Sequence, residues 1–381
     1  MRDLELRKTY EERSIMQEQT KQYDKLLTIT VPAYNVEAYL DRCLSSMVLT
    51  KQTSTEPQPL MSALEVLVIN DGSKDGTEAI GLRYQDEYPD TFRVISKENG
   101  GHGSGINTGI REARGKYFKV VDGDDWVETE TLGRFLEVLS RIDADLIASD
   151  YQLIRDGSYE VQEVRKGMQH LPAGRTAAFS ELTPDDFVKI HAFTIKTELL
   201  RRQNERIDEH CFYVDTEYVM FPIPFTKTVY YDDNILYNYR VGRDGQSVNI
   251  RSMQKNRAQH EKVLEHLLAF FQSYGQEIAG ISDAGWNRRQ STQDSNGDVQ
   301  AKMIYLARGI SLVVENQFQI YLSIGNERQN YEDMRSFDQM LKKQYPLIFR
   351  SVRKKSIWLL RLTSYKIFSI GAAVYKSLRM K

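Results

Sequence analysis

The feature that most limits the fold of this chain is a regular alternation of apolar strand-like runs with helical segments, from residue 26 to about residue 140. The run LEVLVIND (64–71) is typical of a strand buried on both faces, as in a parallel sheet. Repeated strand–helix units predict an α/β fold, with a Rossmann-like, doubly wound sheet flanked by helices. Expected strands cover 26–34, 64–71, 92–96 and 116–121; expected helices cover 36–48, 77–88, 103–113 and a segment through Leu132 and Leu139.

The alternation becomes less regular after Asp150. The segments DLIASDYQLI and YEVQEV are expected to pair as strands. Residues 212–240 predict a helix, a proline-interrupted turn and two further strands, around Val229 and Leu236. From about residue 252 the sequence predicts polar helices, with a loop at 283–299.

We therefore expect three parts: a polar N-terminal lead (1–25), an α/β domain (26–250) and a helical C-terminal extension (251–381). The extension ends in a basic tail, about residues 346–381. Residues 341–381 contain 11 Lys and Arg and no acidic residue, whereas the whole chain carries a net charge of −2. The first 340 residues therefore carry about −13, and the chain has no overall basic excess of the kind that nucleic-acid binding requires.

The tail mixes large apolar residues with Lys and Arg at short intervals. A basic amphipathic helix of this kind can lie in a membrane interface, attracted by anionic lipids and anchored by Trp358 and Phe368. The alternative is a helix that packs on the protein's own body.

The N-terminus lacks a signal-peptide pattern, no uncharged window reaches 18 residues, and the two cysteines, Cys43 and Cys211, fit a reducing compartment. We expect a cytoplasmic protein, peripheral at the inner face of the cell membrane.

Three carboxylates follow directly after the apolar strand KYFKVV: Asp122, Asp124 and Asp125. One interpretation is a solvated turn. The other is a cation site, because buried unpaired carboxylates are costly and a divalent cation reverses that cost. Oxygen ligands at such a turn suit Mg²⁺ or Mn²⁺, which commonly bridge protein carboxylates to substrate phosphates. Asn35, Asp71 and Asn99 also follow expected strands, so one crevice could collect all of these residues.

Four blocks in this order resemble family 2 glycosyltransferases of the GT-A fold: TVPAYNVEAYLDRCLSSM (30–47), VLVINDGSKDGT (66–77), ENGGHGSGINTGIREARGKYFKVVDGDDW (98–126) and YVDTEYVMF (213–221). The resemblance covers roughly residues 26–250 and implies a GT-A catalytic domain with a mixed sheet. It also implies donor-binding positions at Pro32, Ala33, Tyr34, Glu37, Asp71, Asn99, Gly100, Gly101, Asp122, Gly123, Asp124, Asp125, Trp126 and Arg240. Asp122 and Asp124 match the family's D-x-D metal motif. Asn70 departs from the usual D-D-G-S block, which leaves its own role open.

In the family's E-D block, Asp215 matches the catalytic base, but Val214 replaces the usual Glu, so Glu217 remains a rival base. The segment NYRVGRDGQSVN (238–249) resembles the block after the base, where Arg240 or Arg243 could clamp a diphosphate; a surface-loop arginine is the alternative. His102, in a glycine-rich loop, is a candidate metal or phosphate ligand.

The resemblance implies an inverting, metal-dependent transfer of a hexose from a nucleotide-diphosphate sugar, most simply a UDP-sugar. The acceptor would be a hydroxyl of a cell-surface polysaccharide or a lipid-linked saccharide. Two alternatives remain: a polyprenyl-phosphate or teichoic-acid-type transferase, and a catalytically silent, membrane-tethered nucleotide-sugar-binding protein. The sequence leaves the donor sugar, the linkage and the oligomeric state open.

Overall fold

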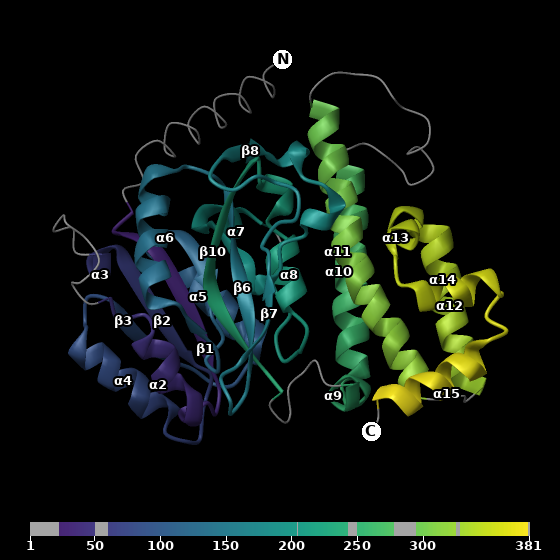
Figure 1. Cartoon of the computed structure of the whole chain (residues 1–381), viewed down its shortest axis with the longest axis horizontal. Helices are drawn as coiled ribbons and strands as arrows, with labels where there is room; N and C mark the ends of the chain where they lie inside the picture. The colour runs from purple at the N-terminus through teal and green to yellow at the C-terminus, as the bar shows by residue number, and fades with distance from the viewer. Residues whose placement is uncertain are drawn as a thin grey trace, which may run out of the picture.

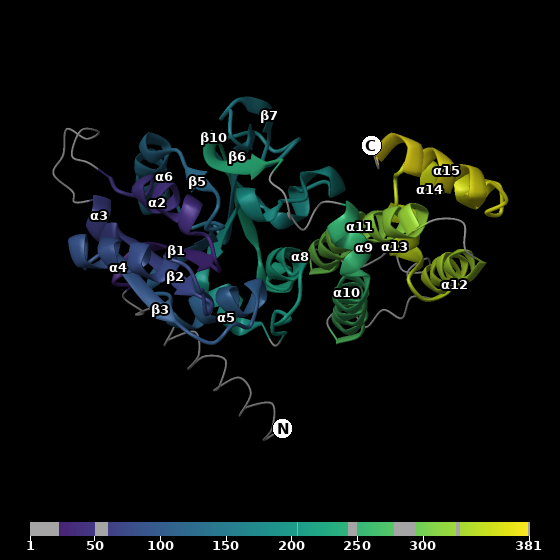
Figure 2. The same cartoon turned by 90° about the horizontal axis from the view of Figure 1, so that it is seen from below.

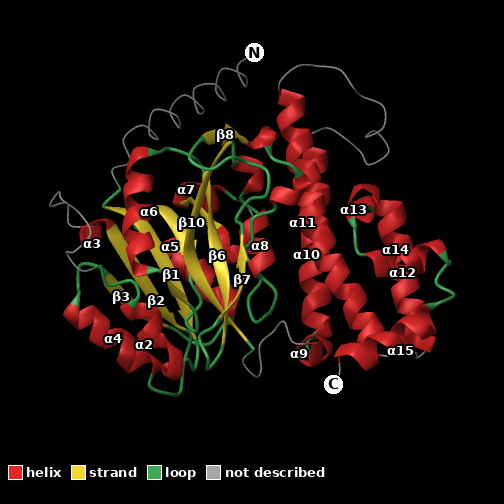
Figure 3. Ribbon diagram, in the orientation of Figure 1, coloured by secondary structure: helices red, strands yellow, loops and turns green. Residues whose placement is uncertain are grey.

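The computed structural model describes residues 23–49, 60–203, 205–242, 250–277, 295–324 and 328–379. Its central element is a ten-stranded sheet in the order β3-β2-β1-β4-β9-β6-β10-β5, with β7 paired to β6 and β8 paired to β10 (Figure 3). The strands are β1 (Lys25–Ala33), β2 (Leu64–Asn70), β3 (Phe92–Ser96), β4 (Gly115–Val120), β5 (Trp126–Val127), β6 (Leu146–Arg155), β7 (Val161–Arg165), β8 (Thr176–Ala178), β9 (Phe193–Lys196) and β10 (Thr228–Val241).

The first four strands, β1 to β4, pair in parallel and coincide with the four strands expected from the apolar runs. Every residue of β2 is buried, as its continuous apolar run indicated. Next to β4 the sheet becomes mixed, because β9 runs antiparallel to both β4 and β6. The predicted pairing of β6 with β7 is confirmed as an antiparallel ladder. The carboxyl ends of β1, β2 and β4 therefore meet at one edge of the sheet.

Helices cover both faces of the sheet. They are α2 (Glu37–Ser45), α3 (Leu60–Ala63), α4 (Thr77–Glu87), α5 (His102–Glu112), α6 (Thr129–Arg141), α7 (Thr197–Arg202) and α8 (Asp215–Met220). Figures 1 and 2 show α2 and α6 on one face and α5 on the other. This is the arrangement that right-handed crossovers give when strand order reverses between β3 and β4.

Two sequence-based expectations about the later chain are corrected. The two strands expected around Val229 and Leu236 are one strand, β10, whose pairing with β6 shifts register between Asp232 and Tyr237. The polar Asp232–Asn234 stretch resembles a turn in sequence but is absorbed as an irregularity within the strand. The loop expected at 283–299 extends too far, because α11 (Ser295–Ile324) already begins at Ser295; residues 283–294, like residues 1–22 of the N-terminal lead, lie outside the described part of the chain.

The C-terminal extension is helical, as predicted. It comprises α9 (Ile250–Lys255), α10 (Arg257–Glu277), α11, α12 (Arg328–Gln344), α13 (Pro346–Ser351), α14 (Lys355–Leu362) and α15 (Phe368–Arg379). The long helix α11 packs with α10 beside α8 on one side and contacts α12, α13 and α15 on the other (Figure 2). A Cβ atom at Gly309 would lie 2.3 Å from Cε2 of Phe187 and 2.4 Å from Cε of Met220, so α11 approaches the sheet domain too closely for a side chain there.

The tail helices pack on the body through one face. Ile348, Ile357, Leu360 and Phe368 are buried, and Arg361 forms a bidentate pair with the fully buried Asp338, its Nη2 2.7 Å from Oδ1. The opposite face of α14 exposes Trp358, Leu359 and Leu362, with Trp358 61% and Leu362 64% exposed. One face of α14 therefore packs on the body of the protein, while contact of its exposed face with a membrane stays a prediction. Among the described residues, no helix is long and apolar enough to cross a bilayer.

Candidate active site

The acidic turn lies where β4 ends, at the edge of the sheet where parallel strands present their ligands. The N–H of Asp125 donates to the carbonyl oxygen of Asp122 at 2.9 Å and closes the turn. Gly123 packs tightly inside it, because a Cβ there would lie 3.1 Å from Val36 Cγ2 and 3.2 Å from the carbonyl oxygen of Pro32. Asp122 and Asp124 remain partly exposed. Two all-oxygen donors that are open to solvent on one turn fit a hard divalent cation.

Asp125 has a different environment from its two neighbours because it is buried. The Tyr237 hydroxyl donates to Oδ2 at 2.6 Å, and the N–H of Arg240 donates to Oδ1 at 2.7 Å. Burial, with the nearby charges of Asp124 and Asp122, raises the pKa of Asp125 well above its ordinary range. These contacts hold the turn in its shape, and the predicted donor-binding role of Asp125 stays a prediction.

Arg240 also lies behind the turn. Its Nε donates to the carbonyl oxygen of Asp124 at 2.8 Å, and its Nη1 pairs with Asp156 Oδ1 at 2.8 Å. The guanidinium lies 5.1 Å from the ring centroid of the buried Trp126, which Arg42 covers at 4.0 Å. These contacts engage Arg240 with the protein's own groups, so its contact with a diphosphate stays a prediction. Arg243, the other candidate clamp, lies outside the described residues.

The glycine-rich loop before α5 is organised by Asp71 at the end of β2. Both carboxylate oxygens of Asp71 accept backbone N–H groups, from Gly100 at 2.9 Å and Gly101 at 2.7 Å, and Lys97 Nζ lies 2.7 Å from Oδ1. Asn99 donates from its side chain to the carbonyl oxygen of Asp71 at 2.9 Å. Gly101 has φ 82°, which favours glycine. The predicted donor-binding residues of this loop therefore form one connected unit.

His102 connects that loop to the acidic turn. It begins α5, and its Nε2 lies 2.8 Å from Asp122 Oδ1. Burial by itself would lower the pKa of His102, but the charge and hydrogen bond of Asp122 raise it overall. At the end of β1, Pro32, Ala33 and the half-exposed Tyr34 border the same edge. Ala33 accepts the N–H of Asp71 at 2.9 Å, and Glu37 Oε2 accepts the N–H of Gly76 at 2.6 Å.

The two candidate bases, Asp215 and Glu217, lie on opposite faces of α8. Asp215 is exposed and electrostatically coupled to both His102 and Asp122. Desolvation by the surrounding protein raises the pKa of Asp215; His102 opposes the shift and Asp122 adds to it. Glu217 is fully buried, 2.8 Å from His266 Nδ1, and accepts the N–H of Asp208 at 2.8 Å. The carboxylate of Glu217 therefore contacts α10, and the prediction of Glu217 as a rival base stays a prediction.

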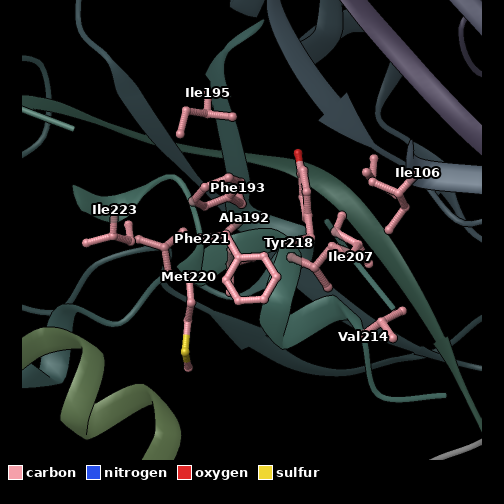
Figure 4. Close-up of a cluster of buried hydrophobic side chains, with 14 of the residues drawn as sticks. Ile106, Ala192, Phe193, Ile195, Ile207, Val214, Tyr218, Met220, Phe221 and Ile223 are labelled. Atoms are coloured by element: carbon pink, nitrogen blue, oxygen red, sulfur yellow. The ribbon is translucent and has the colours of Figure 1, made fainter. Parts of the chain in front are cut away.

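A hydrophobic cluster supports α8 from beneath (Figure 4). Ile106 of α5, Val214 and Ile207 of the preceding loop, and Tyr218 and Phe221 at α8 are buried in it. In this cluster the ring of Tyr218 packs edge-to-face on Phe193 of β9, with centroids 5.2 Å apart. The position of Asp215 is therefore tied to the same core that carries the start of α5.

Sequence reasoning missed a buried layer under the turn. Lys119 of β4 is fully buried, and its Nζ donates to the carbonyl oxygen of His191 at 2.8 Å; burial lowers the pKa of Lys119 to about 7. The His191 ring stacks between aromatic rings, 4.2 Å from that of Tyr239, and burial lowers its pKa to about 3. The position of Lys119 inside the apolar run KYFKVV was the feature of the sequence that could have indicated this buried lysine.

Comparison with known proteins shows which family the chain resembles. The family model described as "Glycosyl transferase family 2" matches residues 28–203. The chain is 28% identical over 230 residues to an uncharacterised glycosyltransferase of Rickettsia typhi. The aligned region covers 60% of this chain and 67% of that protein. The chain is 27% identical over 280 residues to the minor teichoic acid biosynthesis protein GgaB of Bacillus subtilis, which covers 69% of this chain and 28% of that protein.

Among solved structures, the chain resembles S. aureus TarS crystallised with UDP-GlcNAc, with a TM-score of 0.60 and 18% identity. The match covers 93% of this chain and 92% of that one, which shows a common fold that includes the helical extension. The motifs at the strand ends, the mixed sheet and the match over residues 28–203 agree with one another. Residues 28–203 therefore match the family 2 glycosyltransferases, and the chain has a GT-A fold.

Proposed function

We propose that this enzyme transfers a hexose, with inversion, from a UDP-sugar to a hydroxyl group of a cell-surface polysaccharide or lipid-linked saccharide. The observation that carries the proposal is the convergence of three groups from separate segments. Asp122 of the acidic turn lies 2.8 Å from His102 of the glycine-rich loop, and the charges of both residues shift the pKa of Asp215, the first residue of α8. Such a convergence suits a donor whose diphosphate and sugar lie between the turn and α8.

Asp122 and Asp124 are the residues that would hold Mg²⁺ or Mn²⁺, since they are partly exposed carboxylates on one turn. A bound cation would neutralise the charge that develops on the leaving diphosphate. Asp71 keeps the Gly100–Gly101 backbone in place for close approach of the nucleotide. His102 orients Asp122 through its Nε2 contact. Each of these roles depends on a contact that is present before any ligand binds.

Asp215 is the residue that we propose as the base. Its carboxylate would take the proton of the acceptor hydroxyl as the acceptor oxygen bonds to the anomeric carbon and the bond to the nucleotide diphosphate breaks. A single displacement of this kind inverts the anomeric centre. The raised pKa of Asp215 makes it a stronger base than an ordinary aspartate.

The test is sugar transfer or donor hydrolysis with UDP-sugars, with and without Mn²⁺, by the wild type and by the variants Asp215→Asn and Asp124→Asn. Loss of a base is expected to lower kcat by about 10²–10⁴-fold and to leave UDP-sugar binding intact. Asp124→Asn is expected to weaken the metal dependence and donor binding together. The Glu163→Gln variant, on the exposed strand β7, is the control for a surface carboxylate. A preparation that binds UDP-sugars but turns over none of them would instead indicate a binding protein.

We further propose that the acceptor is presented at a membrane and that α14 contacts it. The support is the exposed face of α14, where Trp358, Leu359 and Leu362 lie in a segment with basic residues and no acidic residue. Apolar anchors with basic neighbours suit an anionic lipid surface. The teichoic-acid role in the name of the GgaB relative points to a similar cell-envelope acceptor.

Sedimentation with vesicles containing anionic lipid tests this contact. Deleting residues 346–381 is a poor test, because Ile348, Leu360 and Phe368 are part of the core. The double variant Trp358→Ser/Leu362→Ser changes only exposed side chains and is expected to abolish sedimentation at unchanged thermal stability. Leu82→Ser, which alters a 40% exposed leucine on α4, is the matched control. Unchanged sedimentation of the double variant would refute the contact.

A further inference from the structure

A second cluster of metal-ligating side chains lies on the face of α8 opposite Asp215. It joins Asp208, in the loop before α8, to Glu217 of α8 and His266 of α10. One donor atom from each residue lies within 4.8 Å of the others. His266 Nδ1 is 2.8 Å from Glu217 Oε1 and 3.7 Å from Asp208 Oδ2. The cluster therefore bridges the catalytic domain and the helical extension.

The second donor atom of each residue is held by a neighbour. Lys262 Nζ lies 3.0 Å from Asp208 Oδ1, and the N–H of Asp208 donates to Glu217 Oε2 at 2.8 Å. His266 Nε2 lies 3.3 Å from Glu205 Oε2. A histidine that binds a metal through one ring nitrogen commonly hydrogen-bonds a carboxylate through the other. These outer contacts turn Asp208 Oδ2, Glu217 Oε1 and His266 Nδ1 towards a common centre.

The inner side of this cluster has more acceptors than donors. Asp208 Oδ2 is buried and accepts no hydrogen bond within the described part of the chain. Among the side chains that the structure describes, the carboxylates of Asp208, Glu217 and Glu205 pair with the ammonium group of Lys262 and the imidazole of His266. With a neutral imidazole the group carries a charge of −2, so a dication would balance it and give Asp208 Oδ2 a partner.

We propose that Asp208, Glu217 and His266 bind a divalent transition-metal ion, with Zn²⁺ as the best-matched species, at a site separate from the Asp122–Asp124 turn. Two carboxylate oxygens and one imidazole nitrogen form a donor set that Zn²⁺ accepts, with water in a fourth position. The His266 side chain is 25% exposed, so solvent reaches the cluster.

The proposed ion is structural. It connects α10 to the loop at 205–214, and that loop contacts the glycine-rich donor loop: the N–H of His210 donates to the carbonyl oxygen of Gly100 at 2.5 Å. A Cβ at Gly103 would lie 2.1 Å from the carbonyl oxygen of Asp208, which shows how closely the two loops approach. Without a metal, the same residues form an ion pair between a His266 imidazolium and Glu217. Metal content therefore distinguishes the proposed zinc site from this ion pair.

The test titrates the EDTA-stripped full chain with Zn²⁺, without nucleotide, by calorimetry and by thermal unfolding. Wild type and Asp124→Asn are expected to bind one Zn²⁺ equivalent that His266→Gln lacks. Saturation at 100 times Kd is expected to raise Tm by about 3 °C for a chain of this length. Glu205→Gln keeps all three ligands and is expected to bind the same equivalent about 10–100-fold more weakly.

Equal Zn²⁺ binding by wild type and His266→Gln would overturn the proposal, as would loss of all binding in Asp124→Asn alone. Circular dichroism checks that each variant is folded. Should His266→Gln fail to fold, the Glu205→Gln affinity decides, and an affinity equal to that of the wild type would overturn the proposal.

Discussion

The buried Lys119 allows the effect of burial beneath the acidic turn to be measured as a change in the free energy of unfolding. Its side chain is fully buried in β4, and its Nζ donates to the carbonyl oxygens of His191 at 2.8 Å and Phe193 at 3.4 Å. No carboxylate pairs with it among the residues whose positions are described. Burial alone lowers its pKa from 10.5 to about 7. Replacing Lys119 by Met would remove the amine and keep most of the apolar stem.

The expected magnitude follows from the difference between the two pKa values. A lysine that titrates near pH 7 when folded and near 10.5 when unfolded costs about 4 kcal/mol of unfolding free energy at pH 7. The Met variant avoids this cost, but it also loses the hydrogen bonds to the two carbonyl oxygens, which lowers its unfolding free energy by about 1–2 kcal/mol. We therefore expect Lys119→Met to be more stable than the wild type by about 2–3 kcal/mol at pH 7.

The pH dependence gives a sharper test than the absolute value. Between pH 7 and 10.5 the unfolded wild type binds a proton on Lys119 that the folded state lacks, so wild-type stability rises with pH in this window. The advantage of the variant should therefore shrink by about 2 kcal/mol between pH 7 and pH 9. Urea unfolding at the two pH values measures it. Lys116→Met, at a partly exposed lysine paired with Asp143 at 2.8 Å, is the control on the same strand and should shift stability by about 0–1 kcal/mol. An advantage of Lys119→Met that stays constant from pH 7 to pH 9 would refute the reasoning.

Two further predictions concern the contact of α11 with the catalytic domain and the base. Gly309→Ala should destabilise the protein by about 1–3 kcal/mol in urea unfolding, because the added methyl group has no space. Gly297→Ala, on the same helix with nothing within 4 Å, should be neutral or stabilising by up to about 1 kcal/mol, and equal losses in both variants would contradict this packing. Because Asp215 must be ionised to accept a proton and its pKa is raised above 3.8, kcat/KM should fall on acidification at a higher pH than an ordinary aspartate gives. A pH profile that stays flat down to pH 4 would exclude Asp215 as the base.

The sequence predicts the parallel half of the sheet because local signals decide it. Each of the strands β1 to β4 is an apolar run bounded by turn residues, and each is followed by a helical pattern. β10 was predicted wrongly because its continuity depends on distant pairing. Asp232–Asn234 resembles a turn locally, while β6 pairs with the strand on both sides of it and holds the chain extended. No local pattern contains that information.

The same distinction applies to the site. Residues at strand ends, such as Asp71 and Asp122, could be placed together because parallel strands end at one edge. The environments of Asp125 and Arg240 could not be predicted, because the buried contacts that distinguish them come from segments more than 100 residues apart. The different environments of Asp215 and Glu217 could not be predicted either. They depend on which face of α8 is covered, and the covering residue, His266, lies 49 positions further along the chain than Glu217.

The two faces of α8 connect the helical extension to the proposed base, Asp215, which the sequence of the extension does not suggest. Asp215 lies on the exposed face of α8 while Glu217, two residues later, contacts His266 of α10, so the orientation of the proposed base depends on a contact with the extension. Without α10, the fully buried Glu217 would lose its charged partner, and a buried carboxylate without one costs several kcal/mol. The helix would then rotate or unwind to expose Glu217 to water, and Asp215 would move with it. The extension therefore supports the helix that carries the proposed base, Asp215, and it also carries the exposed face of α14.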